Sequence, residues 1–335
     1  MKPSKIIILA LATTALTACS SDDSETTPQS QQKRQISISV TENPFINPND
    51  ASVKGITTRS AVITTPTLDQ FYMNWTYSFD SSHYKGNKTA TKKENETGKW
   101  ISDEYWPGLD TSEDITVNWY AYTDGEFDLS EDSQNRPSLD FTVEETPSNQ
   151  KDLLVSQTSD TWTNCNGNLF FAFDHACASL RFYVKKAKNM SDYSITVSDA
   201  WLCNVVKEGE FYFDDNSWIL RTAEGVQNHP LYRDKGKTTL SLDDATYQPL
   251  DPYEDPYLFL IPQTLTSWDA SSNTGGCYIK VTCQIIRTAD SHVMHNGDVY
   301  IPFSGILAKG YQYDVNVNIG KNSLYKPDGT KIIND

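Results

Sequence analysis

The sequence predicts an all-β protein, and three observations lead to this prediction. Aromatic residues make up 12% of the 335 residues, and Thr, Val, Ile and Tyr are abundant, which favours strands. Apolar and polar residues alternate with a period of two in many short segments, separated by Asp-Gly and Asn-Gly turn signals. No long stretch keeps a helical period. Short strands at near-regular spacing are typical of β-sandwiches.

The alternation is clearest in five segments, each expected to be a strand: residues 36–40, 115–121, 180–184, 277–285 and 311–319. Cys277 and Cys283 share one face of their segment, so we expect both to be buried as small apolar residues. They lie too far apart along an extended strand to bond to each other. Asn296 and Gly297 lie between apolar segments and predict a hairpin turn.

The N-terminus predicts export. Lys2 and Lys5 form a short positive region before an apolar stretch, residues 6–16, that is too short to span a bilayer as a helix. The tetrapeptide LTAC at residues 16–19 resembles a bacterial lipobox, which implies cleavage before Cys19 and lipidation of that cysteine. The alternative is an ordinary signal peptide with an incidental cysteine. We therefore expect an outer-membrane lipoprotein at the cell surface, attached to the membrane by the lipid on Cys19.

Composition predicts four parts of the chain. Residues 1–18 are the signal peptide, and residues 19–34 are too polar to bury a core and form a flexible tether. The rest divides near residue 160 into an N-terminal sandwich, 35–160, and a C-terminal sandwich with a tail, 161–335. The formal net charge of −16 argues against binding nucleic acid or anionic lipid headgroups by charge.

Five segments together resemble the fimbrillin family of Bacteroidetes, the lipoprotein subunits of type V pili. They are GITTRS at 55–60, KDLLVSQ at 151–157, the FDHACASLRF run at 173–182, LFLIPQ at 258–263, and the closing strands within 301–320. The resemblance implies two tandem transthyretin-like β-sandwich domains. It also implies that the partners are other pilus subunits, in a homo- or heteropolymer used for adhesion.

The same resemblance implies a maturation step. In this family a trypsin-like surface protease cuts after an arginine, the first strand leaves, and an extended segment of another subunit takes its place by donor-strand exchange. Arg59, in a polar Thr-rich segment, is the candidate cleavage site. Ile36, Ile38 and Val40 would form the removable strand. Lys33-Arg34 is a second candidate site, but it precedes that strand; a third interpretation is a subunit that is never processed.

The C-terminal tail is the candidate donor segment. Its apolar anchors would be Leu324, Tyr325, Ile332 and Ile333. Residues 327–329 read Pro-Asp-Gly and predict a turn, which interrupts an ideal donor strand. The position of the chain in a pilus, in the shaft or at the tip or as an accessory subunit, therefore stays open.

Catalytic motifs are weak, so we expect no enzyme, no cofactor and no metal. His292 and His295 are three residues apart in an expected loop without a metal-binding motif. A second function is suggested by the aromatic residues of the first domain. Trp100 and Trp106, if exposed, would stack on host or bacterial glycans and make the protein a glycan- or host-binding lipoprotein that does not polymerise. The alternative is that they fill the sandwich core.

Overall fold

The computed structural model describes residues 34–46, 68–93, 99–107, 114–129, 136–233, 239–250 and 257–333. Strands dominate these residues, which confirms the predicted all-β class. None of the helices in the described ranges is long and apolar enough to cross a bilayer. Each of them is about one turn long: α1 (Trp162–Cys165) and the 3-10 helices η1 (Pro147–Asn149), η2 (Lys188–Met190), η3 (Thr222–Glu224) and η4 (Lys321–Ser323).

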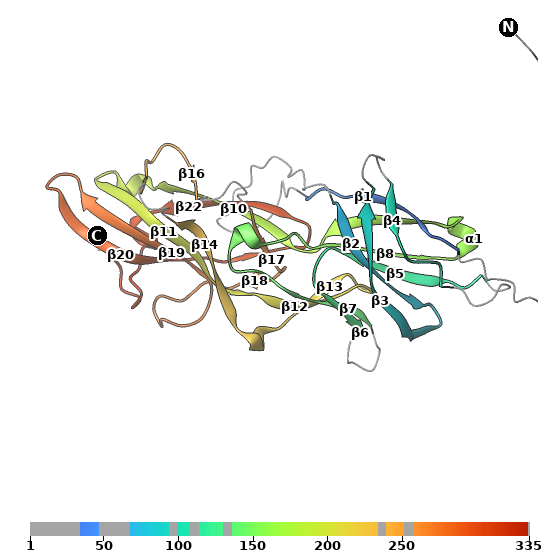
Figure 1. The fold of residues 1–335 in the computed structure, drawn as a ribbon. Coiled ribbons are helices and arrows are strands. Elements are labelled where there is room, and N and C mark those ends of the chain that lie inside the picture. The colour runs from blue at the N-terminus through green and yellow to red at the C-terminus, as the bar shows by residue number, and fades with distance from the viewer. Residues whose placement is uncertain are drawn as a thin grey trace, which may run out of the picture. The chain divides into compact units, whose positions relative to one another are not determined.

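The N-terminal strands form a sheet that closes on itself (Figure 1). Its interior is filled by aromatic side chains such as Phe71, Trp119 and Phe171, none of which is exposed to solvent. The predicted boundary near residue 160 falls at the end of one of these strands, and the next strand of the chain still belongs to the barrel. In barrel order the strands are β1 (Ser37–Glu42), β4 (Trp100–Ser102), β3 (Asp80–Lys92), β2 (Gln70–Tyr77), β5 (Val117–Tyr122), β8 (Leu154–Asp160) and β9 (Asn168–His175).

Two further sheets enclose a second core formed largely by the C-terminal half. In the first, β10 (Ala178–Lys186) pairs with β22 (Gln312–Ile319) on one side and with β16 (Gln248–Pro249) and β17 (Leu258–Leu260) on the other. The second contains β14 (Val226–Arg233), β11 (Tyr193–Val206), β19 (Tyr278–Arg287), β20 (His292–Pro302) and β15 (Leu240–Ser241). A short ladder joins β18 (Thr264–Leu265) to β21 (Gly305–Ile306).

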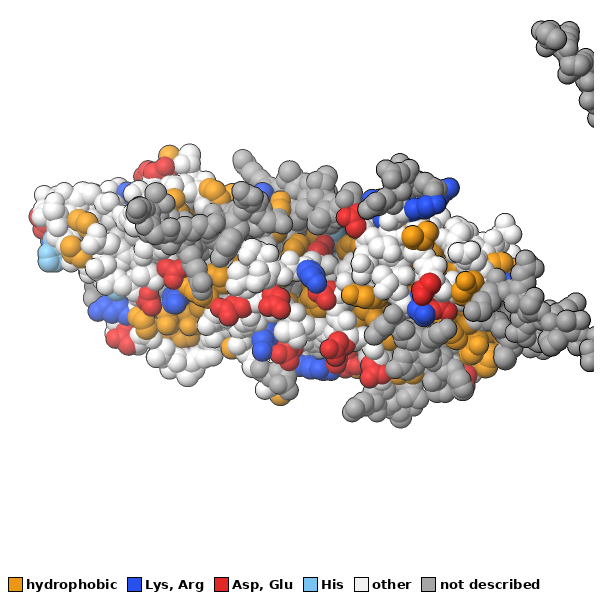
Figure 2. All heavy atoms as spheres, in the orientation of Figure 1, with side chains coloured by type: hydrophobic (Ala, Val, Ile, Leu, Met, Phe, Trp, Pro, Cys, Tyr) orange, Lys and Arg blue, Asp and Glu red, His pale blue; other side chains and the backbone are white. Residues whose placement is uncertain are grey.

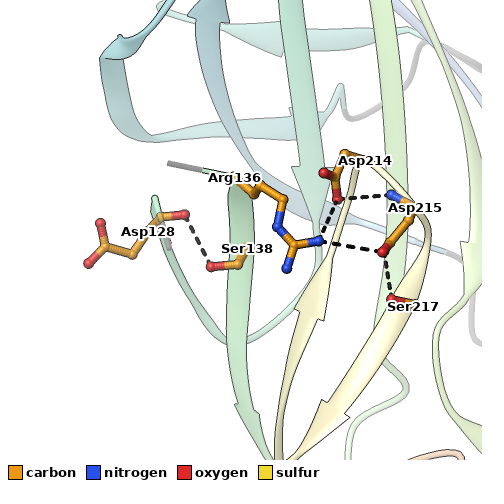
Figure 3. Close-up of polar contacts among 6 residues, drawn as sticks. All are labelled: Asp128, Arg136, Ser138, Asp214, Asp215 and Ser217. Atoms are coloured by element: carbon orange, nitrogen blue, oxygen red, sulfur yellow. Dashed lines mark hydrogen bonds and ion pairs between the residues drawn. The ribbon is translucent and has the colours of Figure 1, made fainter. Parts of the chain in front are cut away.

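A four-stranded sheet combines strands from both halves of the sequence. It has the order β13 (Ser217–Leu220), β12 (Glu208–Tyr212), β7 (Pro137–Thr142) and β6 (Glu126–Leu129). Figure 3 shows Arg136, next to β7, pointing at Asp214 and Asp215 in the turn after β12. The Arg136 guanidinium lies 3.7 and 3.4 Å from the carboxylates of these two residues. The Arg136 guanidinium also lies 3.8 Å from the centre of the Tyr212 ring. Residues Arg34–Asp335 accordingly form one compact unit.

The predicted strands are confirmed. The five alternating segments correspond to β1, β5, β10, β19 and β22. Cys277 and Cys283 are 1% and 2% exposed on the inner face at β19, and both are free thiols. Their burial as small apolar residues is therefore confirmed.

The predicted hairpin at Asn296 and Gly297 is wrong. Both residues lie inside β20, where Gly297 is the ladder partner of Cys283. The chain reverses earlier, between Arg287 and His292. Asp290 makes this turn, because its carboxylate accepts hydrogen bonds from the Arg287 guanidinium at 2.9 Å and from the backbone N–H of His292 at 3.2 Å.

Charged side chains are interspersed over the visible face in Figure 2, with acidic residues scattered among basic and polar ones. This dispersal agrees with the acidic composition. An ion pair between exposed side chains contributes only about 0–1 kcal/mol to the free energy of unfolding. The two hydrophobic cores therefore supply most of the stability.

Candidate functional site

Strand β1 closes the barrel. It pairs in parallel with β9, from Ser37 opposite Asn168 to Glu42 opposite Phe173. Its other edge meets β4 at a single antiparallel pair, Ile38 opposite Trp100. Among the described residues β1 is the strand that joins β4 to β9, so its departure would leave an edge of each strand without a partner.

The predicted removable strand fills part of the barrel core. Ile36 and Ile38 are each 4% exposed and belong to the inner cluster, and Val40 packs against it. The alternating Ser37 and Ser39 face outward, and their hydroxyls donate to the side-chain oxygen of Asn168 at 2.9 and 3.1 Å. The predicted alternation of buried and outward residues is therefore confirmed. The removability of the strand stays a prediction.

The residues before β1 also contact the barrel. The carbonyl of Arg34 accepts a hydrogen bond from the backbone N–H of Trp106 at 2.9 Å. The Arg34 guanidinium lies 5.5 Å from the centre of the Trp162 ring. Gln35 forms an isolated bridge with Tyr105. Because these contacts hold Arg34 against the barrel, they favour a cleavage site elsewhere.

Residues 43–46 continue beyond β1 to the C-terminal sheets, and we call residues 34–46 the N-terminal strap. Its backbone runs beside β9 as far as Phe173, whose carbonyl accepts a hydrogen bond from the N–H of Asn43 at 2.8 Å. Ile46 then lies opposite Tyr311 in a parallel bridge next to β22: its N–H donates to the carbonyl of Gly310 at 2.8 Å, and its carbonyl accepts from the N–H of Gln312 at 3.0 Å. Between these two points the Phe45 side chain turns inward and is 3% exposed.

Phe45 covers a buried acid–histidine pair. Its ring lies 3.5 Å from the ring of His175, at an interplanar angle of 16°. His175 Nδ1 lies 2.5 Å from Asp152 Oδ2, and both side chains are almost completely buried. Burial raises the pKa of Asp152, and the hydrogen bond with His175 opposes this rise. The two side chains therefore form a buried hydrogen-bonded pair that the Phe45 ring covers.

Two of the predicted sites lie outside the described residues. These are Cys19, the predicted lipidation site, and Arg59, the predicted cleavage site. Both stay predictions.

The C-terminal tail is folded onto its own domain. Leu324 and Ile333 are 0% and 4% exposed and belong to the second core, and Ile332 packs against it. Tyr325 bridges Tyr300 of β20 through two backbone hydrogen bonds of 2.8 and 3.2 Å. The expected turn at residues 327–329 is present, closed by the Gly329 N–H donating to Lys326 at 2.9 Å. The candidate donor anchors are thus all engaged in contacts with their own domain.

The proposed glycan-stacking residues require a correction. Trp100 and Trp106 are 8% and 6% exposed and belong to the barrel core. Trp106 packs against Trp119 and Trp162, with ring centres 5.7 and 5.9 Å apart. Neither ring presents a free face to a sugar, because the aromatic interior of the barrel surrounds both. The alternative reading, that they fill the core, is confirmed.

A family profile described as fimbrillin-like matches residues 26–334. The chain belongs to the fimbrillin-like family. This confirms the resemblance carried by the five sequence segments. As a fimbrillin-like chain it is a fimbrial-type structural subunit, in a family that is not a known enzyme class.

Several solved structures are similar to this fimbrillin-like chain. A fimbrial protein from Bacteroides vulgatus is 16% identical with a TM-score of 0.50, over 85% of this chain and 95% of that one. A cell adhesion protein from Parabacteroides distasonis is 11% identical with a TM-score of 0.47, over 89% and 91% of the two chains. One from Bacteroides uniformis is 13% identical with a TM-score of 0.46, over 87% and 95%. None of the curated proteins matches the chain.

Sequence reasoning missed Phe45 and Asp152. His175 lies in the FDHACASLRF segment at 173–182, where the resemblance to the family gives no signal for chemistry. Phe45 stands in a polar, proline-containing stretch without alternation, and Asp152 begins an apolar run. Neither position has a local signal. Phe45 reaches His175 through the pairing of β1 with β9, about 130 residues apart in the sequence, and Asp152 reaches it through the pairing of β8 with β9.

Proposed function

We propose that this chain is a pilus subunit exported as a lipoprotein on Cys19 and matured by cleavage after Arg59. The N-terminal strap then leaves with the lipidated segment. The groove between β4 and β9 accepts an extended segment of another subunit. The observation that carries the proposal is that β1 closes the barrel and lies N-terminal to Arg59, so one cut can free it.

The physics is strand addition. Once β1 has left, the backbone groups of β9 that paired with it need new partners, and the slots of Ile36 and Ile38 are empty. An incoming strand with apolar residues at alternate positions restores both the hydrogen bonds and the buried surface. Membrane contact through the lipid and a trypsin-like surface protease are the partners that this maturation requires.

The tail supports a receiving role in the assembly. A donor segment has to leave its own subunit, but Leu324 and Ile333 complete the second core of this molecule. Removing them would expose core surface and break the bridge to β20. We therefore favour a tip or accessory position, in which the chain accepts a strand and does not donate one.

Digestion of the folded full-length chain with a trypsin-like protease tests the proposal. We expect cleavage after Arg59, release of the segment that carries the strap, and higher-order complexes when other lipobox-bearing subunits are added. The matched control is Arg59→Ala, which should stay uncut and monomeric in size-exclusion chromatography, whereas Arg34→Ala should behave as the wild type. Cleavage after Arg59 without any complex would contradict strand exchange.

A disulfide across the β1–β9 ladder provides a second control. Ser37 and Asn168 are ladder partners whose side chains already touch, so Ser37→Cys with Asn168→Cys suits a disulfide. The oxidised variant should be cut after Arg59 but keep its strap and form no complexes. Reduction should restore assembly. Assembly of the oxidised variant at the wild-type rate would rule out departure of β1.

A further inference from the structure

The strap contains one inward aromatic residue beyond the β1 strand, Phe45, and its ring fills a slot beside His175 and Phe259. The slot has two aromatic walls, since the Phe45 ring centre lies 3.5 Å from His175 and 6.2 Å from Phe259, with interplanar angles of 16° and 21°. The slot is therefore shaped for a flat ring.

The position of this ring is set by backbone contacts on both sides. Asn43 is bonded to Phe173 through its backbone, and its side-chain amide donates to Asp174 at 2.7 Å. Three residues further on, Ile46 is paired with Tyr311. A segment in this groove can thus place only the residue at position 45 into the slot. That residue follows the deepest β1 anchor, Ile38, by seven positions.

The residues at the floor of the slot favour an aromatic side chain over an aliphatic side chain. Asp152 holds His175 through Nδ1, which fixes the plane of the imidazole parallel to the Phe45 ring. His175 Nε2 and Asp152 Oδ1 are buried without a hydrogen-bond partner among the described residues. A flat ring covers the imidazole face and excludes water from this pair, whereas a leucine fills volume but cannot stack.

The tail of the same chain does not match this slot. It contains a single aromatic residue, Tyr325, which pairs with Tyr300 and packs against Trp268 at a ring-centre distance of 6.1 Å. Tyr325 lies one residue after the buried Leu324, not seven. The residue pattern of an occupant from another subunit must therefore differ from that of this tail.

We propose that the slot between His175 and Phe259 is an aromatic recognition site for the strand that replaces the strap. The occupant is an extended segment of a different fimbrillin-type subunit. It runs parallel to β9 and carries an aromatic residue seven positions after an apolar anchor in the Ile38 slot. This inference rests on the proposed strand exchange and names the partner by its sequence pattern.

Amide hydrogen exchange on the uncut full-length chain tests the slot without any cleavage. Phe45→Ala should speed exchange of the Asn43 and Ile46 amides at least tenfold, Phe45→Leu should have an intermediate effect, and Phe45→Tyr should be close to wild type. The matched control is Ile46→Ala, whose side chain is 53% exposed on the same strap. Equal exchange in Phe45→Ala and the control would overturn the aromatic anchor.

Peptide binding to the protease-matured chain tests the partner pattern. A peptide of residues 34–46 should bind the emptied groove, and its Phe45→Ala form should bind about 30-fold more weakly, as for a buried interface anchor. The Phe45→Leu peptide should lie between them, and the Ile46→Ala peptide should match the parent. Binding of the Ala and Leu peptides within threefold of the parent would overturn the recognition site.

The two experiments separate the two proposals. If the chain is not cut after Arg59, or the strap never leaves, the proposed strand exchange and its partner are both overturned, while hydrogen exchange still reports on the anchor. If peptides bind but do not discriminate at Phe45, strand exchange stands and the aromatic site is overturned.

Discussion

At the residue scale, burial without an ionised partner makes His229 sensitive to pH. The side chain is completely buried on β14, and Nδ1 lies 2.9 Å from the carbonyl oxygen of Glu145. Burial lowers the pKa of His229 to about 4, and the hydrogen bond to that carbonyl opposes the shift. In the unfolded chain a histidine has a pKa near 6.5. Between those two values the unfolded chain binds a proton that the folded chain does not.

The free energy of unfolding should therefore fall as the pH drops from about 6.5 to about 4. His229→Asn keeps a donor for the Glu145 carbonyl but removes the titration. We expect the loss of stability between pH 7 and pH 4.5, measured by urea unfolding, to be smaller in this variant by about 2 kcal/mol. The carboxyl groups are the same in the wild type and the variant, so their contribution to the pH dependence cancels in the comparison. The same pH dependence in both would contradict the assignment.

At the element scale, the C-terminal tail acts as part of the second core and not as a free extension. Leu324 is fully buried, whereas Lys326, two residues later, is exposed. The bridge between Tyr325 and Tyr300 fixes the tail along β20. Its apolar residues therefore stabilise the sandwich in the isolated molecule.

Leu324→Ala should lower the free energy of unfolding by about 2–5 kcal/mol, the usual range for a buried leucine. Lys326→Ala is the matched control and should change it by no more than about 0.5 kcal/mol. Urea unfolding followed by tryptophan fluorescence measures both. If the two variants were equally stable, the tail would be loosely attached and available as a donor.

At the scale of the whole molecule, the two halves share structure. Strand β7 lies before residue 160 and pairs with β12 after it, and Leu139 of β7 is buried in the core formed by the C-terminal half. The strap also crosses from the barrel to Tyr311. These connections join both cores within one compact unit.

We therefore expect one cooperative unfolding transition in calorimetry, with the same midpoint by circular dichroism. Leu139→Ala should lower the midpoint of the whole transition without splitting it, because the residue contributes to the shared region. Two separate transitions in the wild type would show that the halves unfold as independent domains, as the sequence-based boundary near residue 160 suggests.

The strand content, the alternating faces of β1, β19 and β22, and the family could be predicted from the sequence. Each rests on local patterns, either the period-two alternation or the order of short segments that resemble the family. The hairpin after β19 was misplaced because Asn296-Gly297 is a strong turn signal, while the actual turn depends on the side-chain contacts of Asp290.

Long-range pairing decided the rest. Closure of the barrel by β1, burial of Trp100 and Trp106, docking of the tail, and the meeting of Phe45 with His175 all join residues far apart in the sequence. Local periodicity says which face of a strand is apolar, but not which strand lies beside it. That choice depends on how all the apolar faces are buried together, and this arrangement placed the aromatic slot beneath the strap.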